Sequence, residues 1–129
     1  ERQPKCMFNH YDDHFKFWNM DGITFPNAKY VHPLKQRDIQ NIYDQLIRDD
    51  NITLLVVFGS SVDFRCHSES DIDLYMERRD KERYPKLDYS FLSDLDKIYD
   101  LKDFSKGLGK SIAEEGIVLF DRRENECVK

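Results

Sequence analysis

Few cysteines and no long apolar run set the first limits on this chain of 129 residues. The cysteines Cys6, Cys66 and Cys127 are scattered and show no Cys-x-x-Cys spacing. This pattern argues against a disulfide framework and favours a reducing compartment. No apolar stretch approaches the roughly 18 to 20 residues of a transmembrane helix, and no signal peptide is recognisable. We therefore expect a cytoplasmic protein with no membrane partner.

Long basic runs are also missing. The chain has 20 Lys and Arg against 25 Asp and Glu, with a net charge of −5. A protein that binds a nucleic-acid polymer usually presents a basic patch or stripe, so nucleic acid is not expected as the main partner. The length suits one domain that buries a core of its own.

The most informative stretch begins with an apolar run over residues 54–58. Its β-branched and aromatic content predicts a strand buried on both faces. Gly59 ends the run and allows a tight turn with close approach of a ligand. Ser60 can then begin a short helix whose backbone N–H groups bind an anion. The sequence thus predicts an anion site at Gly59 and Ser60.

Asp71 and Asp73 follow in a second segment with strand character. Side chains two apart in a strand share a face, so both carboxylates point the same way. A divalent cation would remove their repulsion, and hard oxygen ligands favour Mg²⁺, which also binds phosphates. Each pattern alone has a structural alternative, a common turn or a solvated strand. Together they are complementary halves of a nucleoside triphosphate site.

The order of these residues resembles a known signature. Gly59 and Ser60, then residues 61–70, then Asp71, Ile72 and Asp73 resemble the motif of the minimal nucleotidyltransferases in the polymerase-beta-like superfamily. The resemblance spans roughly residues 36 to 121. It implies an α/β (α+β) fold with a small mixed sheet flanked by helices. It also implies two Mg²⁺ ions, ATP or another nucleoside triphosphate, and transfer of a nucleoside monophosphate, with AMP as the first expectation.

The resemblance further implies a third acidic residue on a neighbouring strand. The sequence of residues 99–104 resembles the segment in which the family carries its third carboxylate. This resemblance makes Asp100 the predicted third carboxylate, with Asp96 and Asp103 as alternatives. Asp100 would then hold the metals together with Asp71 and Asp73 and activate the acceptor hydroxyl.

One departure from the family's pattern concerns the triphosphate. Family members often carry arginine where this chain has Asp63, and Arg65 is nearby but out of register. The residue that neutralises the triphosphate is therefore left open. Val62 and Phe64 are expected to face the core from a short helix.

The remaining chain divides into an N-terminal extension over residues 1–33, the nucleotidyltransferase domain over residues 34–121 and a tail over residues 122–129, expected to be frayed. The extension predicts a β-hairpin closed at Asp21 and Gly22. Helices are predicted from Pro33 to near Asp50 and over residues 105–115, and further strands over residues 98–101 and 116–121.

Two other patterns carry little weight. Cys6, His10 and His14 have a spacing that could ligate zinc on a helix, but a fourth ligand is missing. Residues 107–111 resemble the end of a Walker phosphate loop, but Phe104 stands where that loop requires glycine.

The acceptor is not defined by these residues. Many minimal nucleotidyltransferases are antitoxins paired with a helical HEPN-type toxin, and some add AMP to a tyrosine of that partner. The resemblance implies this role here. One alternative is transfer to a small hydroxylated molecule such as an aminoglycoside, although the extra helical domain of those enzymes is absent. Another is a non-catalytic module that neutralises its partner by contact alone.

Overall fold

The computed structural model describes residues 14–92 and 95–123 of the chain. Within them the elements follow in the order η2 (Ala28–Tyr30), α1 (Pro33–Leu46), β1 (Ile52–Phe58), η3 (Gly59–Val62), β2 (Ile72–Arg78), β3 (Leu95–Tyr99), α2 (Gly107–Glu115) and β4 (Ile117–Asp121). Here η denotes a short 3₁₀ helix. In the described part of the chain, no helix is long and apolar enough to cross a membrane.

The strands form one mixed sheet in the order β3-β2-β1-β4. The central strand β1 is antiparallel to both β2 and β4, whereas β2 and β3 are parallel. A parallel pair of strands needs a long crossover connection. In the connection from β2 to β3, the backbone of Asp88 exchanges two hydrogen bonds with the Gln45 side chain of α1, which fixes the connection to this helix. The mixed sheet with flanking helices confirms the predicted fold class.

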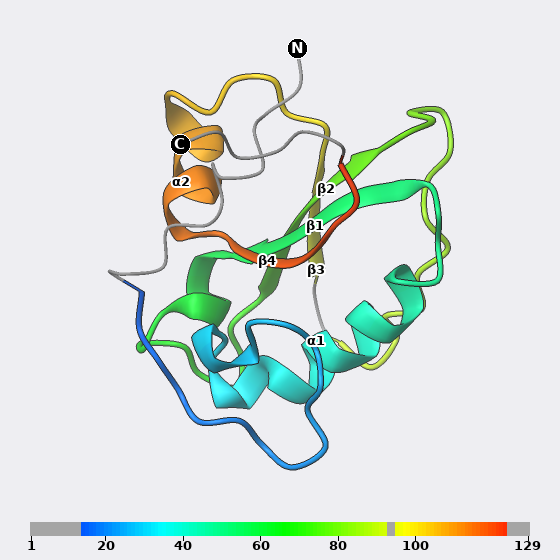
Figure 1. Ribbon diagram of the computed structural model, residues 1–129. Helices are drawn as coiled ribbons and strands as arrows, with labels where there is room; N and C mark the ends of the chain where they lie inside the picture. Colours follow the sequence, from blue (N-terminus) through cyan, green and yellow to red (C-terminus); the bar gives the residue numbers. More distant parts are fainter. Residues whose placement is uncertain (1–13, 93–94, 124–129) are drawn as a thin grey trace.

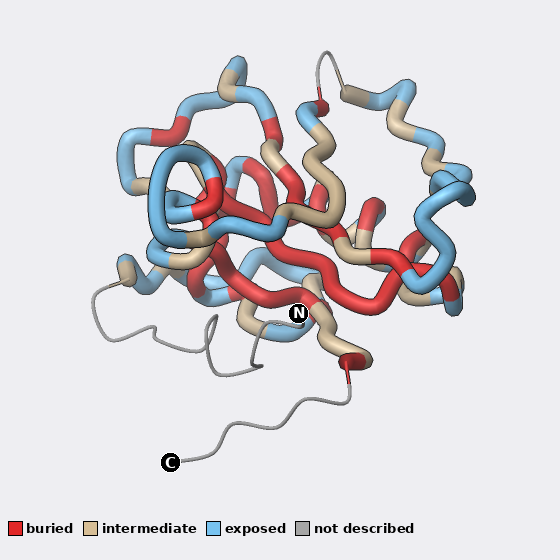
Figure 2. Tube along the Cα trace, turned by 90° about the horizontal axis from the view of Figure 1, so that it is seen from above, coloured by how far each residue is buried: buried red, intermediate tan, exposed pale blue. Residues whose placement is uncertain are grey.

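The two helices cover opposite faces of the sheet. Alternate residues of β1 point to one cluster that contains the buried residues of α1, or to a second that contains Ile112 of α2. Figure 1 shows the sheet passing between α2 and α1, and Figure 2 shows that buried residues concentrate along the central strands. Every residue of β1 is buried, so the strand predicted to be covered on both faces is confirmed.

Helix α1 begins where the sequence predicts. Pro33 occupies the first turn, where its missing N–H costs nothing, and the His32 side chain accepts a hydrogen bond from the Leu34 N–H at 3.1 Å. The helix ends at Leu46, earlier than expected. Beyond it the Asp49 carboxylate accepts from the Asn51 N–H at 2.9 Å. Such a side-chain turn competes with helix continuation.

The N-terminal segment departs from the prediction. A turn forms at Asp21 and Gly22, and Gly22 has φ +83°, but residues 14–32 contain no strand, so the predicted hairpin is wrong. Three of its backbone donors, those of Met20, Thr24 and Phe25, bond to side chains of α1 instead of a partner strand. Gln40 accepts from the N–H groups of Thr24 and Phe25.

Gln36 on α1 holds the same segment from within the core. Its side chain is fully buried, and its Oε1 accepts from the Met20 N–H at 2.7 Å. Its Nε2 donates to the carbonyls of Trp18 at 2.8 Å and Val31 at 3.0 Å. One amide thus satisfies backbone groups on both sides of the turn.

We expect Gln36→Leu to lower the free energy of unfolding by about 2–3 kcal/mol, because it leaves buried backbone groups without partners. Urea denaturation measures the change. Gln45→Leu is the matched control on the same helix, since its bonds to Asp88 are solvent-exposed and should cost less than about 1 kcal/mol. Equal losses in the two variants would show that Gln36 is not a special anchor.

The start of the C-terminal tail is ordered, contrary to the expected fraying. Arg122 donates through its guanidinium to the carbonyls of Ile47, Asp49 and Ile52. Arg123 is 2% exposed and pairs with Asp121 at 2.9 Å. Arg122 fastens the end of β4 to the chain that leads from α1 into β1, and Arg123 also pairs with Glu77 of β2.

Candidate active site

The glycine turn packs directly against one of the predicted aspartates. Phe58, the last residue of β1, is the register partner of Asp73 in β2, and Gly59 follows with φ +75°. A Cβ atom added at Gly59 would collide with Oδ2 of Asp73. Glycine is therefore required here for its backbone conformation and for the space beside the carboxylate.

The serines after the glycine fasten this corner. The Ser60 hydroxyl donates to the backbone carbonyl of Asp71 at 3.2 Å, which joins η3 to the start of β2. The Ser61 carbonyl accepts from the His32 N–H at 2.7 Å, which joins η3 to the start of α1. The two halves of the sequence motif are thus held together by direct contacts.

We expect Gly59→Ala to reduce both stability and activity. A non-glycine residue in this left-handed conformation costs about 1–3 kcal/mol, and the added methyl would displace the Asp73 carboxylate. Thermal denaturation and nucleotide titration measure the two effects. Gly22→Ala is the matched control, because Gly22 also has a positive φ but a Cβ there meets nothing within 4 Å. It should lower stability and leave nucleotide binding intact.

The aspartates lie on the face of the sheet that α2 partly covers. Along β2, Ile72, Leu74 and Met76 belong to the cluster that contains α1 residues. Asp73 and Tyr75 therefore point to the opposite face, where Tyr75 packs in the second cluster. Asp71 precedes β2 in the same alternation and is exposed, while Asp73 is half-buried. The pleat places Asp73 on this face, and the common face of Asp71, which lies just before β2, stays a prediction.

Asp96 on β3 lies beside this pair. In the parallel register of β2 and β3, Asp73 is the direct partner of Asp96. The next residue on the same face of β3, Ile98, packs against the cluster that contains Ile112, so Asp96 shares the face of Asp73. Neighbouring strands are about 4.8 Å apart. Asp73 and Asp96 are thus neighbours at one corner of the sheet, and Asp71 lies two residues before Asp73 at the same end of β2.

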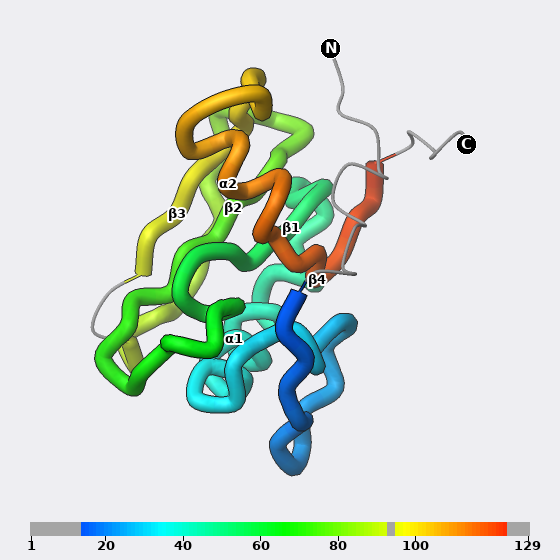
Figure 3. Tube along the Cα trace, turned by 90° about the vertical axis from the view of Figure 1, so that its left-hand side faces the viewer, coloured from blue at the N-terminus to red at the C-terminus, as the bar shows by residue number. Residues whose placement is uncertain are grey.

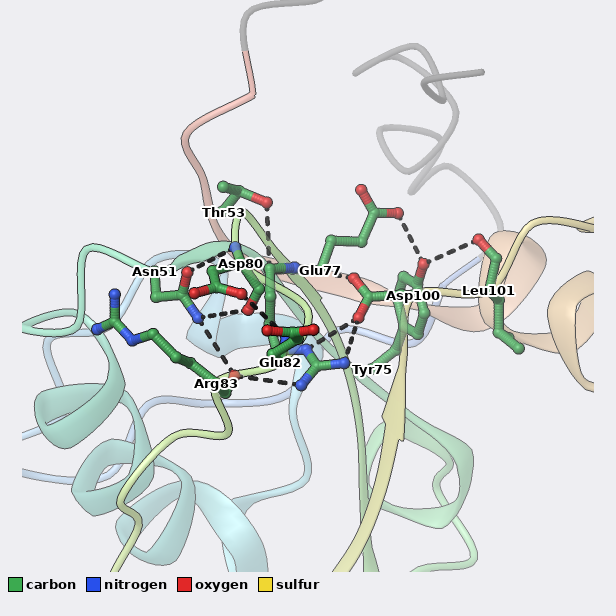
Figure 4. A network of polar contacts seen from close by, with 10 residues as sticks. Asn51, Thr53, Tyr75, Glu77, Asp80, Glu82, Arg83, Asp100 and Leu101 are labelled. Carbon is green, nitrogen blue, oxygen red and sulfur yellow. Dashed lines mark hydrogen bonds and ion pairs between the residues drawn. The ribbon is translucent and has the colours of Figure 1, made fainter.

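Asp100 lies elsewhere, contrary to the sequence prediction. It follows the end of β3 with φ +50°, and its carboxylate accepts from the backbone N–H and Nε of Arg78, each at 2.9 Å. Figure 4 shows Asp100 within this network. Arg78 ends β2 and Asp73 lies near its start, which at about 3.3 Å per residue separates them by roughly 16 Å. The structure therefore does not bring Asp100 to Asp71 and Asp73.

The other alternative, Asp103, is also remote from the corner. Its carboxylate accepts from the backbone N–H and hydroxyl of Ser105, at 2.9 and 2.6 Å, in an exposed turn before α2. Of the three candidates that the sequence offered for the third carboxylate, only Asp96 lies beside Asp73. The residues around Asp100 match the family's sequence pattern, but a local pattern does not contain the register between strands. That register decides which residues lie beside one another.

The sequence model of the family described as "Polymerase beta, Nucleotidyltransferase" matches residues 40–125, more than half of the chain. The chain belongs to this family. The matched region of this nucleotidyltransferase contains all four strands of the sheet and the corner formed by Gly59 and the three aspartates. Comparisons with curated proteins and with solved structures find no match.

The short helix η3 ends at Val62, so the residues that follow it lie differently from the expectation. Val62 is buried as predicted, but Phe64 is 58% exposed, so its predicted core position is wrong. Arg65 is bound to Asp63, with 2.7 Å between Nη2 and Oδ2. The hydrogen bonds from Arg65 lower the pKa of the Asp63 carboxyl. The chain thus keeps an arginine near the glycine turn, but as the partner of Asp63.

Tyr75 lies on the same face of β2 as Asp73, but its hydroxyl proton is already engaged in a hydrogen bond. Its hydroxyl donates to the Glu77 carboxylate at 2.7 Å. Burial, followed by the hydrogen bond to Glu77, raises the pKa of Tyr75 above its ordinary value. The phenol of this nucleotidyltransferase therefore stays neutral and supports the sheet.

The donor set at the corner suits a hard divalent cation. In residues 14–92 and 95–123, no three His, Cys, Asp or Glu side chains already converge around one point. Asp73 and Asp96 nevertheless share one face, Asp71 lies just before β2, all three offer only oxygen ligands, and the missing Cβ of Gly59 lets the Asp73 carboxylate pack against the turn. Of Cys6, His10 and His14, which the sequence does not predict as a zinc site because a fourth ligand is missing, His14 packs edge-on to Tyr30, while Cys6 and His10 lie outside the described residues.

Proposed function

We propose that this domain transfers a nucleoside monophosphate from a nucleoside triphosphate to a hydroxyl group and releases pyrophosphate. One observation supports this reaction best. Within a polymerase beta nucleotidyltransferase domain, the Gly59 turn packs on Asp73 while Asp96 lies beside Asp73 in register. Neighbouring carboxylates beside a glycine turn with its backbone N–H groups are the kind of donors that phosphoryl chemistry with a divalent metal uses.

In this proposal Asp71, Asp73 and Asp96 would hold Mg²⁺. Bound Mg²⁺ neutralises triphosphate charge and stabilises the leaving pyrophosphate. The backbone N–H groups of Gly59 and Ser60 would donate to phosphate oxygens and fix the triphosphate against the corner. The Ser60 hydroxyl already bonds to the carbonyl of Asp71, so it positions β2 and is not reserved for the phosphates.

Asp96 is also the base of the proposed reaction. It is exposed on β3, the edge strand beside β2, where an incoming hydroxyl would meet the corner. The hydroxyl oxygen forms a bond to the α-phosphorus, the bond from that phosphorus to the β-phosphate bridging oxygen breaks, and the hydroxyl proton passes to the Asp96 carboxylate. Asp100 takes no part, because Arg78 holds it at the other end of β2.

The resemblance to minimal nucleotidyltransferases supports a narrower form of the proposal. There the nucleotide is ATP, the acceptor is a tyrosine of a HEPN-type partner, and the protein acts as an antitoxin. A small hydroxylated acceptor is the alternative enzyme function. A module that only binds its partner is the alternative without catalysis, and it requires none of the three aspartates.

Intact-mass analysis separates these functions. The protein is incubated with Mg²⁺ and ATP, GTP, CTP or UTP, alone and with the product of the neighbouring gene. A gain of one nucleoside monophosphate on the neighbour, lost in Asp71→Ala, supports the enzyme and its protein acceptor. A stable complex without any mass gain contradicts transfer to that partner and supports the binding module.

A further inference from the structure

A pocket of about 170 Å³ opens beside the glycine turn. Its lining contains Gly59, Val62 and Asp63 around the turn, the rings of His14 and Phe15 as an aromatic wall, and Glu114 and Glu115 at the end of α2 as an acidic wall. Figure 3 shows the start of the described chain, in dark blue, close to the junction of α2 and β4. The pocket shares Gly59 with the proposed triphosphate corner, so one ligand can reach both.

The size and charge of the pocket limit which part of a nucleotide can enter. Pockets for whole drug-sized ligands hold about 300–1,000 Å³, so this one suits a single ring system. Its carboxylates lie at the C-terminal end of α2, where the helix dipole is also negative. A phosphate would be repelled there, whereas a neutral ring with hydrogen-bond donors would be attracted.

The aromatic wall of the pocket is held in place by its neighbours. Phe15 packs on Phe64 with ring centroids 4.8 Å apart, which explains why Phe64 lies on the surface. The Arg65 guanidinium lies 5.7 Å from the centre of the Phe64 ring. Phe15 is still 50% exposed, and an exposed aromatic face is a surface on which a base can stack.

The acidic wall breaks a local rule of helix stability. Glu114 and Glu115 are exposed in the last turn of α2, which has no basic residue, although acidic side chains at this end oppose the helix dipole. Oε1 of Glu114 is 3.8 Å from Nζ of Lys110, and both side chains are largely exposed. This ion pair therefore stabilises the helix little. Such conflicts with local preference are expected at functional sites. The Asp63 carboxylate already accepts a hydrogen bond from Arg65. The carboxylates of Glu114 and Glu115 are therefore the acceptors that the acidic wall offers to a ligand.

We propose that this pocket binds the base of the nucleoside triphosphate and selects bases that carry an exocyclic amino group over uracil. The inference rests on the proposed nucleotidyl transfer. A carboxylate accepts a hydrogen bond from the amino group of cytosine, adenine or guanine. Uracil instead presents carbonyl oxygens on both sides of its single ring N–H, and these oxygens repel carboxylates.

CTP and UTP are the sharpest pair of probes, because both are pyrimidines of the same size and differ at one exocyclic group. Isothermal titration in the presence of Mg²⁺ should show CTP binding about tenfold more tightly than UTP, the loss expected for one base-specific contact. In Glu114→Gln/Glu115→Gln the ratio should fall to near one, because a glutamine amide can donate to uracil as well as accept from cytosine.

Two further variants separate base selection from other effects. Phe15→Ala should weaken CTP and UTP by similar factors and keep their ratio, because stacking does not distinguish the two pyrimidines. Glu82→Gln removes an exposed carboxylate from the distant β2–β3 connection and should change neither affinity. A ratio that persists in the double glutamine variant would overturn the proposal.

Tripolyphosphate distinguishes this inference from the proposed function. If tripolyphosphate, CTP and UTP bind with Mg²⁺ but CTP and UTP bind equally, the base inference is overturned while the triphosphate corner stands. If none of the three binds, both proposals are overturned.

Discussion

Asp73→Asn is expected to reduce nucleotidyl transfer about a thousandfold or more, the scale seen when a charge-stabilising group is removed from an active site. Asparagine keeps the shape that packs on Gly59 but removes the negative charge between Asp71 and Asp96. Cation binding at the corner should weaken for the same reason. Pyrophosphate release in the presence of Mg²⁺ and nucleotide, together with Mn²⁺ titration followed by electron paramagnetic resonance, measures both effects.

The fold should survive this substitution. Asp73 is one of three clustered carboxylates, and removal of one charge relieves repulsion in the protein without metal. Asp88→Asn is the matched control, because Asp88 is an exposed carboxylate in the β2–β3 connection whose partner is Ser90. It should leave transfer and metal binding unchanged. Transfer by Asp73→Asn at more than about a tenth of the normal rate would contradict the assignment of the corner as the active site.

The features that the sequence predicted correctly depend on local patterns. The apolar run that became β1, the stop at Gly59 and the alternation around Asp73 each involve residues close in the chain, where side-chain periodicity determines the face. The signature that joins Gly59 to Asp73 also spans a short segment. Its two halves meet because β1 and β2 are neighbouring antiparallel strands with Phe58 opposite Asp73.

The features that the sequence did not predict depend on pairing between distant segments. The connection from β2 to β3 contains no helix or strand among its described residues, so the sequence offers no measure of where β3 aligns with β2. Asp96 and Asp100 are four residues apart, so a four-residue shift of β3 against β2 decides which of them lies beside Asp73. The N-terminal segment was mispredicted for the same reason. Nothing in residues 15–25 indicates that its backbone groups would bond to side chains of α1 and not to a partner strand.

Asp96 and Asp100 therefore provide the strongest test of the structure, because their substitutions should have opposite effects. Asp100→Asn is expected to lower the free energy of unfolding by about 3–5 kcal/mol, the cost of removing one partner from a buried ion pair. The Arg78 guanidinium lies 2.7 Å from Asp100 and its side chain is 6% exposed. The Arg78 guanidinium carbon also lies over the rings of Tyr84 and Tyr99, 4.4 and 4.6 Å from their centres.

Asp96→Asn should instead retain the stability of the protein and lose transfer by a factor of at least about a hundred, because the exposed carboxylate is proposed to bind metal and accept the hydroxyl proton. Urea denaturation and pyrophosphate release, both measured at a temperature where each variant is folded, give the two quantities. If Asp100→Asn abolishes transfer in the folded protein while Asp96→Asn is active, the register of β2 and β3 is wrong. The opposite result would show that strand pairing places the third carboxylate of this active site at Asp96.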